Sequence, residues 1–151
     1  MNKDKTPILL VTGVSGAGMS STLKLLEDIG YHIIENLPFR FFSSLLKDKE
    51  FIKKPLAIGV DTRNRDFDVE EILSQFSHLE NHVEIETNIL FLECDDDRLI
   101  ERFKANRRKH PLAIDASVRE AIEEERGYID CLKEHADLVI DTTHLSVKEL
   151  K

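Results

Sequence analysis

Short runs of apolar and β-branched residues alternate with amphipathic segments along the whole chain. The runs predict buried strands at residues 8–12, 31–34, 55–60, 87–92 and 138–140. Between the strands, apolar residues recur at helical spacing and predict helices at residues 19–29, 36–46, 68–79, 96–105 and 117–134. Short apolar strands separated by helices are typical of a parallel sheet covered on both faces. The pattern therefore predicts an α/β domain with a five-stranded parallel sheet.

Capping signals support several of these helix boundaries. Asp68 and Glu71 have the spacing of a capping box, with Asp in place of the usual Ser or Thr, at the start of the helix predicted at residues 68–79. Ser117 and Glu120 have the same spacing at the start of the last long helix. Ser146 and Glu149 repeat that spacing, but the chain stops at Lys151, before two further helical turns are complete. We therefore expect residues 1–151 to form one domain of a longer protein.

Composition and charge narrow the classes of function. The chain has 151 residues, of which 29 are acidic and 21 basic, and its net charge of −8 disfavours non-specific binding to nucleic acid. Its two cysteines provide no disulfide framework, which suggests a reducing compartment. No apolar run reaches the length that a transmembrane helix needs. We expect a cytoplasmic protein without a membrane partner.

A glycine-rich stretch directly follows the first strand and opens the first helix. It matches the phosphate-loop pattern G-x-x-x-x-G-K-[ST] at every fixed position but one and comprises Gly13, Val14, Ser15, Gly16, Ala17, Gly18, Met19 and Ser20. Backbone N–H groups of such a loop wrap a phosphate, and the helix dipole faces it. Ser20 stands where a hydroxyl coordinates Mg²⁺. The alternative is a glycine-rich turn without a ligand, which the position between strand and helix disfavours.

Met19 occupies the position of the usual lysine. That lysine donates charge-assisted hydrogen bonds to the β- and γ-phosphates, which contribute about 1.5–3 kcal/mol. Without it, we expect nucleotide binding to be weakened roughly tenfold to a hundredfold. Hydrolysis is expected to suffer more than binding, because negative charge develops on the transferred phosphoryl group.

A second candidate site follows the third predicted strand. Asp61, Thr62, Arg63 and Asn64 lie at its carboxyl end, the edge of an open α/β sheet where ligands bind. Asp61 is placed to hold Mg²⁺ through water or to orient an attacking water, and Arg63 to pair with a phosphate. The alternative is a helix-entry loop in which Asp61 caps the helix and Arg63 is solvated.

Basic residues cluster from the fourth predicted helix into the following loop. Arg102, Arg107 and Arg108 are candidates for a lid that closes over the phosphates. The alternative is that these basic residues form a solvated surface and pair with neighbouring carboxylates.

Several longer motifs together resemble the RapZ (YvcJ) family of bacterial P-loop proteins. They cover essentially the whole chain, at residues 10–38, 61–64, 90–95, 107–112 and 136–142. The resemblance implies a P-loop NTPase-like, kinase-like fold. It also implies binding and slow hydrolysis of ATP or GTP with Mg²⁺, the ATP at residues 13–20 and a guanine-nucleotide-associated motif at residues 61–64. Met19 departs from the family pattern.

The resemblance also implies partners. In enteric bacteria the family member is an RNA-binding adapter, and that activity depends on a C-terminal half that this chain lacks. Residues 1–151 are then the N-terminal module, which meets RNA or a regulatory protein only through the full-length protein, and a homo-oligomer is a further expectation. Two other hypotheses are a small-molecule kinase, from the order of strands and helices, and a non-catalytic P-loop domain that serves assembly.

Overall fold

The computed structural model describes residues 5–35, 37, 41, 44, 53–60, 68–80, 85–106 and 117–145. Five parallel strands form a single sheet in the order β2-β3-β1-β4-β5. The strands are β1 (Thr6–Gly13), β2 (His32–Glu35), β3 (Leu56–Gly59), β4 (Ile85–Glu93) and β5 (Leu138–Asp141). The helices are α1 (Met19–Asp28), α3 (Val69–Glu80), α4 (Asp96–Asn106) and α5 (Val118–Glu134).

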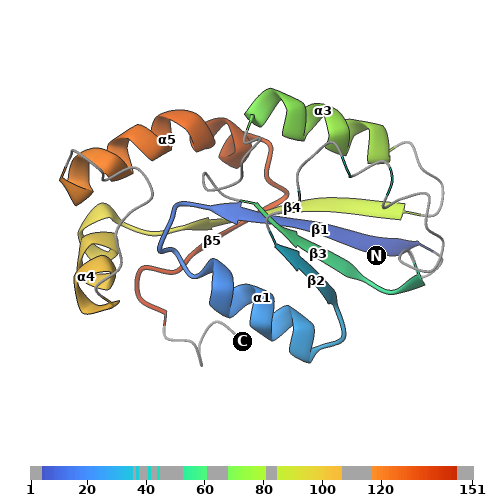
Figure 1. The fold of residues 1–151 in the computed structure, drawn as a ribbon, viewed down its shortest axis with the longest axis horizontal. Helices are drawn as coiled ribbons and strands as arrows, with labels where there is room; N and C mark the ends of the chain where they lie inside the picture. The colour runs from blue at the N-terminus through green and yellow to red at the C-terminus, as the bar shows by residue number, and fades with distance from the viewer. Residues whose placement is uncertain are drawn as a thin grey trace.

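The helices lie on both sides of the sheet, as the sequence predicted. Helix α1 covers one face, α3 and α5 cover the other, and α4 lies beside the end of the sheet where β1 and β4 finish (Figure 1). Each described element begins and ends within a few residues of its predicted position. The helix predicted at residues 36–46 falls largely outside the described residues.

Burial follows the position of each strand in the sheet. The central strand β1 and its neighbour β4 carry the core, where Leu10, Phe91 and Leu92 are fully buried. Leu138 and Val139 of the edge strand β5 are instead 56% and 41% exposed. The other edge strand, β2, also has no fully buried residue, so the prediction that these two strands are buried was wrong. An edge strand has a neighbour on one side only, and apolar composition alone does not identify it.

Predicted caps are present at two helix starts. The Asp68 carboxylate accepts hydrogen bonds from the N–H groups of Glu70 and Glu71 before α3. The Ser117 hydroxyl accepts one from the Glu120 N–H at the start of α5. Each cap satisfies N–H groups that have no partner inside the helix.

The strand order determines where a ligand site can form. The chain leaves β1 toward β2 and β3 on one side of it and later returns to β4 on the other side. In open α/β sheets, ligands bind beyond the carboxyl ends of the strands where the order reverses. The glycine-rich stretch after β1 lies at this point.

Candidate functional site

The glycine-rich loop joins the end of β1 to the start of α1. Gly13 closes β1 with a φ of 153°, and a Cβ there would lie only 2.3 Å from the Leu92 carbonyl oxygen of β4. Gly18 is the N-cap of α1 and has the left-handed φ of 109°. Only glycine adopts such backbone without strain. The glycine positions are therefore explained by the shape of the loop.

The first turn of α1 is open to an anion. Its N-cap residue Gly18 makes no side-chain capping hydrogen bond, and the turn contains no acidic residue. The first N–H groups of a helix have no intrahelical acceptor and carry the positive end of the helix dipole. Ser20, in this turn, is exposed. These donors fit a phosphate, and the Ser20 hydroxyl is chemically suited to a Mg²⁺ that accompanies it.

Met19 packs against the sheet. It is partly buried against the hydrophobic core, and its Sδ lies 3.5 Å from the position that a Cβ on Gly59 of β3 would take. The Met19 side chain thus extends from the start of α1 over the end of β3. Because a thioether carries no charge and donates no hydrogen bond, Met19 leaves the loop without the cation of the usual pattern.

Residues from α4 and from the end of β5 support the loop from outside. The Arg102 guanidinium donates hydrogen bonds to the Gly16 carbonyl, at 3.1 Å, and to the Thr142 carbonyl and hydroxyl. The Thr142 hydroxyl also donates to the Ala17 carbonyl. Arg102 therefore reaches the predicted phosphate site through the loop backbone, and its role as a lid stays a prediction.

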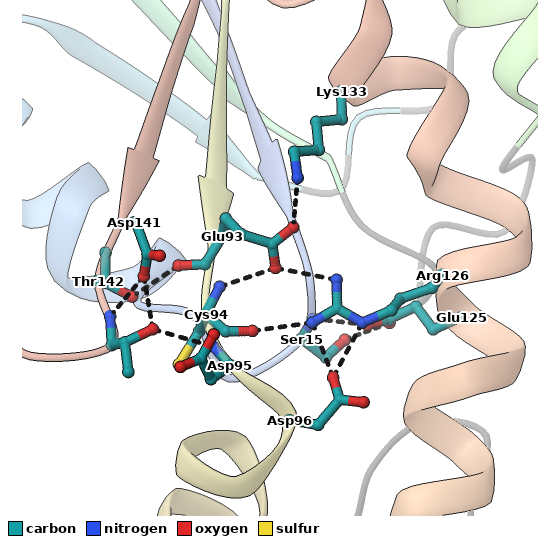
Figure 2. Close-up of polar contacts among 11 residues, drawn as sticks. Ser15, Glu93, Cys94, Asp95, Asp96, Glu125, Arg126, Lys133, Asp141 and Thr142 are labelled. Carbon is teal, nitrogen blue, oxygen red and sulfur yellow. Dashed lines mark hydrogen bonds and ion pairs between the residues drawn. The ribbon is translucent and has the colours of Figure 1, made fainter.

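A buried carboxylate from α5 holds the other side of the loop. Glu125 is completely buried and accepts hydrogen bonds from the Ser15 N–H at 2.6 Å and from the Ser15 hydroxyl at 2.5 Å (Figure 2). Sequence reasoning missed this residue. The available signal was its spacing, because Glu125 occupies a core position of α5 in line with Ile122 and Ile129.

The next residue of α5, Arg126, forms ion pairs and a hydrogen bond with residues where β4 leads into α4. Arg126 pairs with Glu93 at 2.9 Å and with Asp96 at 2.8 Å, and it donates a hydrogen bond to the Cys94 carbonyl (Figure 2). Two opposing effects act on the pKa of Glu93. Burial favours the neutral acid, but hydrogen bonds from the Cys94 N–H, Lys133 and Arg126, together with the charge of Arg126, favour the carboxylate more strongly. The net result is a pKa below the ordinary value of a glutamate.

Other predicted residues fall outside the described part of the chain. Asp61, Thr62, Arg63 and Asn64 are among them, as are Arg107 and Arg108. Their assignments to guanine nucleotide, hydrolysis and the lid remain predictions. Among the described residues, no group of three His, Cys, Asp or Glu side chains is arranged to hold a metal ion. No described helix is long and apolar enough to cross a bilayer.

Comparison with known families identifies the domain. Residues 6–151 match the family described as the RapZ-like N-terminal domain. The chain belongs to this family. It is 42% identical over 144 residues to a nucleotide-binding protein of Paramagnetospirillum magneticum, covering 95% of this chain and 47% of the relative. A nucleotide-binding protein of Zymomonas mobilis is 40% identical over 149 residues, covering 95% and 46%. This RapZ-like domain thus spans about half the length of the curated relatives it matches.

Solved structures confirm the kinase-like fold of the RapZ-like domain. Shikimate kinase from Acinetobacter baumannii, in complex with shikimate, matches with a TM-score of 0.62 at 15% identity, covering 97% of this chain and 89% of the kinase. The YorR protein of Bacillus subtilis, in complex with phosphorylated GDP, matches with a TM-score of 0.60 at 13% identity, covering 95% and 90%. At these identities the likeness concerns the fold alone.

Proposed function

We propose that this RapZ-like domain binds ATP or GTP with Mg²⁺ and hydrolyses the nucleotide slowly. The observation that carries the proposal is the loop of residues 13–20, which ends at an α1 N-terminus without a side-chain cap or an acidic residue. Such a terminus binds phosphate through backbone N–H groups and the helix dipole. The printed names of the relatives, which are nucleotide-binding proteins, support the same ligand.

In this proposal each part of the loop has a defined task. The N–H groups of residues 16–20 surround the phosphates, and the Ser20 hydroxyl coordinates Mg²⁺, which neutralises phosphate charge when bound. Asp61 orients the attacking water and Arg63 pairs with a phosphate, while residues 61–64 favour a guanine nucleotide. Arg102, Arg107 and Arg108 complete the phosphate site from α4 and the following loop.

Met19 makes the proposed hydrolysis slow. As the γ-phosphoryl group is transferred to water, negative charge grows on the leaving oxygen. A lysine stabilises that charge, whereas the Met19 thioether provides neither charge nor donor. The domain would then bind nucleotide in a regulatory capacity more effectively than it turns it over.

The test is calorimetric titration of Mg²⁺-ATP and Mg²⁺-GTP into the wild-type chain and the Met19→Lys variant. We expect the variant to bind roughly ten to a hundred times more tightly, corresponding to the about 1.5–3 kcal/mol of charge-assisted hydrogen bonds. Met19→Leu is the matched control, because it keeps the apolar contact with the core and adds no charge. It should bind as the wild type does.

Two results would count against the proposal. If neither the wild type nor Met19→Lys binds nucleotide at millimolar concentration, the loop is structural. If Met19→Leu gains as much affinity as Met19→Lys, the lysine charge is not the missing contribution. Phosphate transfer to an added small acceptor, in place of water, would favour a kinase.

A further inference from the structure

Thr142 is a buried residue that joins the end of β5 to the glycine-rich loop of residues 13–20. It directly follows β5 and is 3% exposed. Its hydroxyl donates a hydrogen bond to the Ala17 carbonyl at 2.5 Å and itself accepts one from the Arg102 guanidinium at 3.1 Å. A hydroxyl has a single proton to donate, and the Glu93 carbonyl lies farther from it, at 3.2 Å. The Ala17 carbonyl is therefore the principal acceptor of the Thr142 proton.

The direction of the Ala17 carbonyl determines the direction of the next N–H group. In a planar trans peptide the C=O and the following N–H point in opposite directions. The Gly18 N–H therefore points away from Thr142, and it makes no hydrogen bond with any residue in the described part of the chain. Space is open around Gly18, since a Cβ there would have nothing within 4 Å. The Gly18 N–H is thus an available donor at the start of α1.

The peptide between Ala17 and Gly18 needs an external contact to hold this orientation. Glycine accepts positive and negative φ about equally, so Gly18 by itself allows the peptide to rotate. The rotated peptide would present the Ala17 oxygen where the N–H now lies, and an oxygen there repels a phosphate that the N–H would bind. The Thr142 hydroxyl stabilises the orientation that presents the N–H. Arg102 acts on the preceding peptide in the same way, through the Gly16 carbonyl.

We propose that Thr142 is a positioning residue of the candidate site, whose hydroxyl holds the peptide between Ala17 and Gly18 so that the Gly18 N–H faces the phosphate. This inference rests on the proposed nucleotide binding and adds the residue that orients one of its donors. It also gives a role to the end of β5, to which none of the predicted site residues belongs.

The experiment removes the hydroxyl and then restores it. Thr142→Val keeps the shape of the side chain without the hydroxyl, and Thr142→Ser keeps the hydroxyl. Thr143→Val is the matched control, because Thr143 is also buried but its hydroxyl bonds to Asp141 and to the Asp95 N–H. All three are made in the Met19→Lys chain, where we expect the tightest binding, and titrated calorimetrically with Mg²⁺-ATP.

We expect Thr142→Val to bind Mg²⁺-ATP about threefold to tenfold more weakly than Met19→Lys alone, the effect of one neutral hydrogen bond. Thr142→Ser and Thr143→Val should remain within about twofold of it. An unchanged affinity in Thr142→Val overturns the role of Thr142 alone. An equal loss in Thr142→Ser or Thr143→Val also overturns it, because packing or general stability would then be the cause. If Met19→Lys itself binds no nucleotide, both proposals are overturned.

A second measurement observes the peptide directly. In the chain without substitutions, Mg²⁺-ATP should shift the ¹⁵N–¹H resonance of Gly18 together with those of Met19 and Ser20. Thr142→Val should reduce the shift at Gly18 more than the shift at Ser20, which a general loss of stability would not do. An unchanged Gly18 resonance beside shifted Met19 and Ser20 resonances would show that this N–H does not contact the phosphate and would refute the inference.

Discussion

Gly13 lies where the glycine-rich loop leaves β1, close to the neighbouring strand β4. A Cβ at this residue would meet the carbonyl oxygen of Leu92 at 2.3 Å and the Leu92 Cβ at 2.9 Å, and its φ of 153° is unfavourable for other residues. Gly127, in the exposed part of α5, has nothing within 4 Å of its hypothetical Cβ. Glycine is therefore required at Gly13, where no side chain fits, whereas at Gly127 it lowers the stability of the helix without a steric reason.

The two glycines predict opposite effects of the same substitution. Gly13→Ala should lower the free energy of unfolding by about 1–3 kcal/mol or more, because strand β4 must move away from the added methyl group. Gly127→Ala should raise it by roughly 0.5–1 kcal/mol, since alanine loses less entropy in a helix. Urea unfolding of both variants measures the difference. A Gly13→Ala variant as stable as the wild type would mean that the close contact with Leu92 relaxes freely.

At the scale of elements, α5 connects the glycine-rich loop of residues 13–20 with the rest of the candidate site. Glu125 contacts Ser15 of the loop, and the next residue, Arg126, contacts Glu93 and Asp96 where β4 leads into α4. Helix α4 in turn contacts the loop through Arg102 and the Gly16 carbonyl. The loop is thus enclosed by two helices that are also joined to each other, which holds its backbone in place.

The ion pairs of Glu93 predict a loss of stability in acid. The folded-state pKa of Glu93 lies below its ordinary value. Its contribution is therefore fully present above the pKa of an unfolded glutamate, about 4.3, and is lost as pH falls through the lower folded-state pKa. We expect Glu93→Gln to be less stable than the wild type at pH 7, with the difference shrinking below about pH 4.

Unfolding free energies measured from pH 7 to pH 3 provide the check. Glu124→Gln serves as the control, because this exposed carboxylate lies outside the Arg126 cluster. A gap between wild type and Glu93→Gln that stays constant with pH would show that the substitution acts through packing and not through charge.

At the scale of the whole molecule, charge and length set the expected partners. The chain carries a net charge of −8 and spans about half of its curated relatives. A field of this sign repels a phosphate backbone. Residues 1–151 alone are therefore not expected to bind RNA tightly.

RNA binding should therefore need more than this domain. At about 0.15 M salt, we expect residues 1–151 to show no RNA binding in gel-shift or polarisation assays. Repeating the assay at lower salt distinguishes weak electrostatic contact from none. Tight RNA binding by residues 1–151 at about 0.15 M salt would contradict this expectation.

The sequence determined the features that depend on local chemistry. Alternating apolar runs and helical spacing were sufficient for the parallel sheet and its helices, and the caps at Asp68 and Ser117 were readable from neighbouring residues. The loop of residues 13–20 was recognisable because its glycines, its position between strand and helix, and the missing lysine are all contiguous in the chain. The exposed edge strand β5 was not, because exposure depends on which strands become neighbours.

Only the tertiary structure decided which distant residues meet the loop. Glu125 lies 110 residues from Ser15, and Arg102 lies 86 residues from Gly16, yet both contact the loop directly. No local pattern encodes such pairings, since they arise when parallel strands bring their carboxyl ends to one edge and helices pack around it. The sequence by itself determined a glycine-rich loop that lacks the lysine of the phosphate-loop pattern. The packing of α5 against this loop decided that a buried carboxylate, Glu125, accepts hydrogen bonds from Ser15.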